Sequence, residues 1–285
     1  MQDNKFTFSS FIEITKLRLS VSVVFSSVIS YLIGMSEFDF ETFIYLVFGG
    51  LMMVSASNIF NQIIERDLDA LMQRTKGRPL PMGQISVNNA LVLGFVFVIS
   101  GLTFLYIISP LCAMLGAISI FIYACVYTPL KLITPLSVFV GAIPGAIPFM
   151  LGWVAATNEL GVEALALFLM QFFWQFPHFW ALAWKLDEDY KKAGFRLLPS
   201  GDRNQKSAFQ IMLYSAFLVP VSMLPWASEM TGTWSMWSAV VISLIMYYPA
   251  VKLYFTLDKK YATQLMFMSF LYLPILFTMY CFNQI

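Results

Sequence analysis

Apolar runs of about 20 residues recur along almost the whole chain, and each is long enough for a helix to cross the hydrocarbon core of a bilayer. In lipid every backbone N–H and C=O must be paired within the protein, so a run of this length is expected to be helical. Nine runs are predicted to span a membrane, at residues 17–35, 42–64, 89–109, 111–130, 135–157, 162–184, 207–227, 234–254 and 261–282. The sequence therefore predicts an all-α polytopic membrane protein, a bundle of about nine transmembrane helices.

Composition agrees with this class. Of the 285 residues, 59% are hydrophobic and 12% are charged, which is far too apolar for a water-soluble domain. The longest polar stretches are residues 1–16, 65–88 and 185–206, and none is long enough for a separate soluble domain. We expect residues 1–285 to form a single integral membrane domain.

The distribution of charge orients the predicted bundle. With the N terminus in the cytoplasm, the nine spans place all 17 Lys and Arg residues on the inner side. The opposite loops carry acids alone, at Glu37, Asp39, Glu41, Glu159, Glu163 and Glu229. Because cytoplasmic loops retain Lys and Arg, we expect the N terminus inside and the C terminus outside. The start has neither a signal-peptide nor a transit-peptide pattern, so a bacterial inner membrane is the expected location.

A polar stretch directly follows the second predicted span. Asn61, Glu65 and Asp69 are spaced four residues apart, so on a continuing helix their side-chain oxygens lie along one face. Mg²⁺ favours oxygen ligands and is usually held by one or two carboxylates together with substrate phosphates. Arg74 and Arg78 come next, and guanidinium groups match phosphate oxygens. The pattern predicts a metal–diphosphate site with Asn61, Glu65 and Asp69 as metal ligands.

The alternative is an ordinary solvated helix end, where charge runs form surface salt bridges. Two observations favour the metal site. Carboxylates at a helix C-terminal end lie against the macrodipole, so stability alone would not select them. A second inside stretch repeats the pattern just past another span, with Asp187, Glu188, Asp189, Tyr190, Lys191 and Lys192. Two such loops on the same face can close over one diphosphate.

The only histidine of the chain, His178, lies in the aromatic segment from Trp174 to Trp180. A lone histidine among aromatic residues is more often packed, with its ring nitrogens satisfied. Within a membrane span, however, ionisable groups are rare and functional by default. The rings around it are either core residues or walls for a flat aromatic ligand. His178 is thus a base, a ligand or a packing residue.

Several segments between residues 60 and 200 resemble the UbiA superfamily of intramembrane prenyltransferases. They are Asn61-Gln62-Ile63-Ile64-Glu65-Arg66-Asp67-Leu68-Asp69 with Arg74-Thr75 and Arg78-Pro79-Leu80, then Tyr127-Thr128-Pro129-Leu130-Lys131, Pro177-His178-Phe179-Trp180, and Asp189-Tyr190 with Ala193-Gly194. With Glu65 at the middle position of the first motif, the chain resembles the heme O synthase subfamily. Two positions depart from the general superfamily pattern, because Gln62 and His178-Phe179 stand where Asp is frequent. The subfamily has the same kind of change.

This resemblance implies transfer of a farnesyl group from farnesyl diphosphate to a vinyl group of heme B, with release of diphosphate. It implies Mg²⁺ as cofactor and an intramembrane site. Catalytic roles are expected for Asn61, Glu65, Asp69, His178 and Asp189, with His178 or Asp189 accepting a proton. Substrate contacts are expected for Arg74, Arg78, Lys131, Lys185 and Tyr190.

Three other functions fit parts of the pattern. A prenyltransferase acting on another aromatic acceptor, such as a quinone precursor, shares the first motif. A membrane transporter has a similar number of helices but is expected to place ionisable residues near the midplane, whereas the acids here gather at one face. A structural assembly protein would not need two converging loops. Besides farnesyl diphosphate, heme B and the lipid bilayer, we expect heme-pathway or terminal oxidase assembly proteins as partners, and no nucleic acid.

Overall fold

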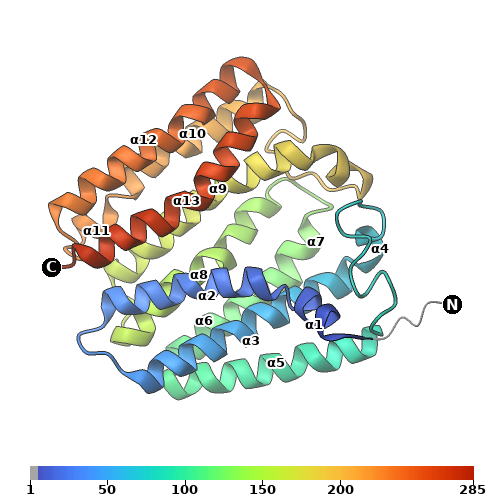
Figure 1. Cartoon of the computed structure of the whole chain (residues 1–285), viewed down its shortest axis with the longest axis horizontal. Helices are drawn as coiled ribbons and strands as arrows, with labels where there is room; N and C mark the ends of the chain where they lie inside the picture. Colours follow the sequence, from blue (N-terminus) through green and yellow to red (C-terminus); the bar gives the residue numbers. More distant parts are fainter. Residues whose placement is uncertain (1–5) are drawn as a thin grey trace.

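A computed structural model describes residues 6–285 as a bundle of long helices, and no strand occurs among these residues (Figure 1). The N-terminal half contains α1 (Phe8–Ile14), α2 (Leu17–Gly34), α3 (Phe40–Ile64), α4 (Arg66–Asp69), α5 (Val87–Ile108), α6 (Pro110–Phe121), the π-helix η1 (Ile122–Tyr127) and α7 (Thr128–Leu130). The remainder contains α8 (Ser137–Thr157), α9 (Val162–Lys192), α10 (Gln205–Val221), α11 (Leu224–Ala227), α12 (Thr233–Thr256) and α13 (Lys259–Phe282). The all-α class predicted from the apolar runs is therefore confirmed.

In the described part of the chain, eight helical segments are long and apolar enough to cross a membrane. They correspond to eight of the nine predicted spans and make the chain a multi-pass membrane protein. The remaining predicted span, at 162–184, lies in α9, a helix of 31 residues. Gln171, Gln175 and His178 make α9 less apolar than the other eight. α9 nevertheless packs between α8 and α13 in the middle of the bundle (Figure 1).

Helix α5 shows how side-chain size is distributed in the bundle. Its buried positions are mostly small, whereas its exposed positions carry large apolar side chains. The buried residues are Ala90, Gly94, Gly101 and Leu105, and the exposed ones include Val92, Phe95, Val96 and Ile99. Small residues let helix backbones approach closely in lipid, where burying a large apolar side chain brings no gain over leaving it against the acyl chains. This pattern is typical of a membrane protein.

Two glycines in α8 mark close approaches between helices. A Cβ at Gly152 would lie 2.0 Å from the carbonyl oxygen of Ser27, so α8 can pack against α2 only with glycine there. A Cβ at Gly145 would lie 2.0 Å from Oε1 of Gln175 on α9. These contacts hold α8 between α2 and α9 at the centre of the bundle.

The polar segments gather at one end of the bundle. α1, α4 and the loop that follows α9 lie at this end, while the C terminus lies at the other end (Figure 1). The two stretches that the sequence assigned to the same side, 65–88 and 185–206, thus meet in space. The arrangement agrees with an odd number of crossings between α1 and the C terminus.

The orientation of this bundle in the membrane remains a prediction. We expect the end that carries α4 to face the cytoplasm, because all Lys and Arg residues lie on that predicted side. Reporter fusions within residues 70–86 and after Ile285 test this. A cytoplasmic reporter should be active at 70–86 and inactive after Ile285, whereas cytoplasmic activity at both positions would require an even number of crossings.

Candidate functional site

Asn61, Glu65 and Asp69 lie in successive turns at the end of α3 and in α4. Helix α3 ends where Glu65 leaves helical geometry, with φ −93° and ψ 7°. The backbone spacing nevertheless continues, since the Glu65 N–H donates to the Asn61 carbonyl at 2.9 Å and the Asp69 N–H to the Glu65 carbonyl at 2.7 Å. All three side chains are buried. Asp67, which falls between them, points outward and pairs with Arg66.

Both buried carboxylates are paired with cations. Nζ of Lys131 lies 2.7 Å from Oε1 of Glu65, and Nη1 of Arg78 lies 2.6 Å from Oδ2 of Asp69. Oδ1 of Asp69 is buried and has no hydrogen-bond partner among the described residues. Burial raises the pKa of Asp69, and the charge of Arg78 offsets part of this rise. Asp69 therefore has one oxygen available to a further positive ligand.

Lys16 completes this cluster, although the sequence identifies it only as one of the basic residues on the inner side. Its backbone lies in the left-handed region, with φ 46°, at the start of α2. Its Nζ donates to Oδ1 of Asn61 at 3.4 Å. Burial, together with the positive charges of Arg78 and Lys131, lowers the pKa of Lys16 to about 7. Three basic side chains thus surround two carboxylates.

Buried amides of α3 hold the segment that carries Lys16. Nε2 of Gln62 donates to the carbonyl of Ile14 at 2.7 Å, and Nδ2 of Asn58 donates to Oγ of Ser20 at 3.3 Å. Gln62 is the position where the superfamily frequently has Asp. In this chain it faces α1 and α2, and its amide donates to the backbone before Lys16. The departure from the motif therefore has a structural role here.

A local distortion brings Thr128 and Lys131 to the same site. Pro129 has no N–H, and the preceding turns widen into the π-helix η1, a distortion that is frequent at functional sites. Oγ1 of Thr128 donates to the Tyr123 carbonyl at 2.8 Å and accepts from Nδ2 of Asn61 at 3.3 Å. Thr128 was not among the predicted site residues. Its position next to Pro129 and Lys131 is the sequence feature that could have identified it as a site residue.

Three predicted residues lie at the edge of this cluster. The Arg74 guanidinium lies 5.9 Å from the centre of the Tyr190 ring. Asp189 accepts hydrogen bonds from the backbone N–H groups of Gln73 and Arg74, at 3.0 and 3.3 Å. The structure therefore joins the two inside loops through Asp189, with Arg74 and Tyr190 beside the junction.

The other two predicted residues, His178 and Lys185, lie between α9 and α13. Nδ1 of His178 lies 2.7 Å from Oγ of Ser269, and the imidazole stacks on Trp174 with ring centres 4.8 Å apart. Nζ of Lys185 lies 5.4 Å from the centre of the Phe267 ring. The predicted residues thus form two groups, a charged cluster on α3, α4 and α7 and an aromatic seam on α9 and α13.

The donor set of the charged cluster fits Mg²⁺ better than a metal that needs a full protein cage. Among residues 6–285, no group of three or more His, Cys, Asp and Glu side chains is placed to hold a metal. Glu65, Asp69 and the Asn61 amide are nearby oxygen donors, and Asp69 has an unpartnered oxygen. Mg²⁺ is typically bound by one or two carboxylates, with phosphates and water completing its shell.

Comparison with known proteins agrees with this geometry. The family model described as UbiA prenyltransferase family matches residues 22–271. A protoheme IX farnesyltransferase from Flavobacterium psychrophilum is 53% identical over 98% of this chain and 96% of its own length. A second protein of that name, from Christiangramia forsetii, is 51% identical over 97% of this chain and 93% of its own length.

A solved structure shares the fold at lower identity. A UbiA homolog from Archaeoglobus fulgidus, bound to GPP and Mg²⁺, superposes with a TM-score of 0.68 at 16% identity, over 95% of this chain and 99% of that one. The resemblance found in residues 60–200 thus extends over most of the sequence and over the fold. The chain belongs to the UbiA prenyltransferase family.

Proposed function

We propose that this chain transfers a farnesyl group from farnesyl diphosphate to a vinyl group of heme B, the reaction indicated by the name of its relatives that are 51–53% identical. The observation that carries the proposal is the cluster of Lys16, Arg78 and Lys131 around the buried Glu65 and Asp69. It offers more basic groups than carboxylates at the end of an apolar bundle, which suits a substrate with a lipid tail and an anionic head.

The diphosphate would bind among Lys16, Arg78 and Lys131. As the carbon–oxygen bond to the farnesyl group breaks, negative charge accumulates on the leaving diphosphate, and preorganised cations stabilise it. Asn61, Glu65 and Asp69 would hold Mg²⁺, which supplies further neutralisation of that charge. Diphosphate binding would then compete with the carboxylates for the same cations, so the Lys131–Glu65 and Arg78–Asp69 pairs are expected to open.

A small apolar cavity of about 40 Å³ lies next to this head group, and we propose that it marks the path of the prenyl tail once the surrounding helices move apart to admit it. The cavity lies between α2, α3, α6 and α8, and its lining includes Val24, Gly50, Met53, Ser57 and Pro148. Ser57 is one helical turn from Asn61 on α3, and Met53 is one turn further. The lining of α3 therefore leads from the charged cluster into the bundle, away from bulk water. An allylic cation formed there is shielded until the new carbon–carbon bond forms.

Of the two predicted proton acceptors, His178 is the one with a free acceptor atom among the described residues. Oγ of Ser269 donates to the Met266 carbonyl at 2.6 Å, so it accepts from Nδ1–H of His178. Nε2 then carries a lone pair, and no described residue bonds to it. The Asp189 carboxylate, by contrast, is occupied by two backbone donors. Bonding of the farnesyl group to one vinyl carbon leaves a cation on the other, next to the porphyrin, and water adds there. We assign to His178 Nε2 the proton that this water loses.

The cellular setting of this reaction follows from the same charge distribution. We propose a bacterial inner membrane, with the diphosphate and the heme propionates at the cytoplasmic end and both apolar bodies among the helices. A quinone precursor as acceptor is the second candidate, because it needs the same diphosphate cluster. The identity to protoheme IX farnesyltransferases favours heme B.

The first experiment is to identify the product. Membranes that contain the chain should convert added farnesyl diphosphate and heme B into a more hydrophobic heme, heavier by one farnesyl group and one hydroxyl group. Chromatography with mass detection measures it. If the farnesyl group is found in a quinone fraction and the heme pool is unchanged, the result would support a quinone precursor as the acceptor instead.

Loss of one buried carboxylate should be costly. Glu65→Gln and Asp69→Asn retain size and hydrogen-bonding capacity but remove a charge that would hold the metal. Each should reduce the rate on the order of a hundredfold or more, because transition-state stabilisation of several kcal/mol is lost. Asp67→Asn is the matched control and should have little effect, since that side chain points outward. Equal damage from all three changes would contradict the assigned cluster.

Two substitutions of His178 separate a base from a packing residue. His178→Asn can keep the bond to Ser269 near the Nδ1 position but has no atom in place of Nε2, whereas His178→Ala loses both. If Nε2 accepts the proton, both variants should lose on the order of a hundredfold or more in rate at normal membrane abundance. Near-normal activity of His178→Asn would make His178 a packing residue.

A further inference from the structure

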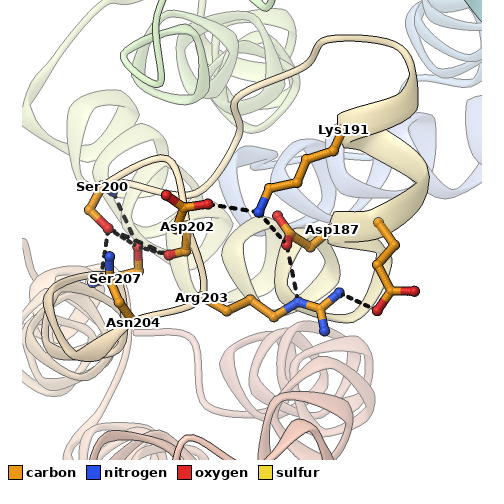
Figure 2. A network of polar contacts seen from close by, with 8 residues as sticks. Asp187, Lys191, Ser200, Asp202, Arg203, Asn204 and Ser207 are labelled. Carbon is orange, nitrogen blue, oxygen red and sulfur yellow. Dashed lines mark hydrogen bonds and ion pairs between the residues drawn. The ribbon is translucent and has the colours of Figure 1, made fainter.

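The acidic side chains of the second inside loop are committed to partners within the protein. Residues 185–206, all of which the structure describes, contain four acids. Asp187 pairs with Lys191 at 3.0 Å and with Arg203 at 3.3 Å, Glu188 with Arg203 at 3.1 Å, and Asp202 with Lys191 at 2.7 Å (Figure 2). In Figure 2 these groups link the end of α9 to the segment before α10. These ion pairs therefore connect different parts of the same loop.

Asp189, the fourth acid, is directed to the other loop. Its Oδ1 accepts from the Gln73 N–H at 3.0 Å and its Oδ2 from the Arg74 N–H at 3.3 Å. Partial burial works to raise the pKa of Asp189, but these two bonds and the charges of Lys192 and Arg74 lower it below its usual range. Both oxygens thus bond to two consecutive peptide groups of the segment between Asp69 and Arg78, and Nζ of Lys192 lies 3.7 Å from Oδ1.

An apolar contact supports the same junction. Met72, Ala193 and Phe195 are buried against one another, and the Tyr190 ring packs beside them. The Phe195 ring centre lies 5.8 Å from Nζ of Lys131, and the Arg196 N–H donates to the Lys131 carbonyl at 3.4 Å. The second loop therefore contacts the segment that carries Arg78 and also the residue that pairs with Glu65.

We infer that the second inside loop is a clasp for the diphosphate site and that Asp189 is a positioning residue instead of a metal ligand. By fixing the peptide groups of Gln73 and Arg74, it holds the 70–78 segment so that Arg78 reaches Asp69. This inference rests on the proposed function for the identity of the ligand, but the clasp itself is a property of the ligand-free protein. It leaves a single metal-binding cluster, on α3 and α4.

The test compares Asp189→Asn and Asp189→Ala with Asp202→Asn, which removes the same charge from the exposed part of the same loop. Hydrogen exchange of residues 70–78 in the full-length, ligand-free protein measures the clasp directly. Exchange should be faster in both Asp189 variants, and more so in Asp189→Ala, whereas Asp202→Asn should match the wild type. Unchanged exchange in both Asp189 variants would overturn the clasp.

Steady-state kinetics separate positioning from metal binding. The clasp predicts that the KM for farnesyl diphosphate rises by about tenfold or more in Asp189→Ala, consistent with a loosened charged contact. The Mg²⁺ concentration for half-maximal rate should stay at the wild-type value. A rise in the Mg²⁺ requirement, partly restored by excess Mg²⁺, would make Asp189 a metal ligand. If the wild type transfers no farnesyl group, the proposed function is refuted. The hydrogen-exchange result would then still show whether Asp189 fixes the 70–78 segment.

Discussion

The burial of charge at one end of an apolar bundle is the constraint on which the rest of the structure depends. Unpaired ions are costly away from water, and even a buried pair is stable only when its geometry and remaining hydrogen bonds are good. Glu65 and Asp69 each have a cation, yet Lys16 is an additional basic group and one oxygen of Asp69 has no partner among the described residues. Such a cluster is better satisfied by a bound anion and a metal than by itself.

The surrounding elements place these charges by separate means. Amides of α3 bond to the backbone before Lys16, the π-helix before Pro129 turns Lys131 toward Glu65, and the second loop fixes the segment before Arg78. Each device acts on the backbone next to a cation. The cations are therefore held ready for a ligand, so little of the binding free energy is used to order them.

The sequence predicted what depends on periodicity and composition. The apolar runs gave the helices, and the four-residue spacing placed Asn61, Glu65 and Asp69 together because the backbone spacing continues through the end of α3. It did not identify Lys16, whose contribution depends on a left-handed backbone and on a partner 45 positions away. Nor did it separate His178 from the charged cluster, since which neighbour α9 faces is decided by packing. The polar residues of α9 make it less apolar than the eight helices that are apolar enough to span a membrane, although it packs among them.

A structure with Mg²⁺ and a non-hydrolysable farnesyl diphosphate analogue tests the central claim most directly. The account predicts the diphosphate among Lys16, Arg78 and Lys131, with the metal on Glu65 and Asp69, the two ion pairs opened, and the tail along α3 past Ser57. An analogue bound instead by the acids of residues 187–189, with the Lys131–Glu65 and Arg78–Asp69 pairs intact, would contradict it.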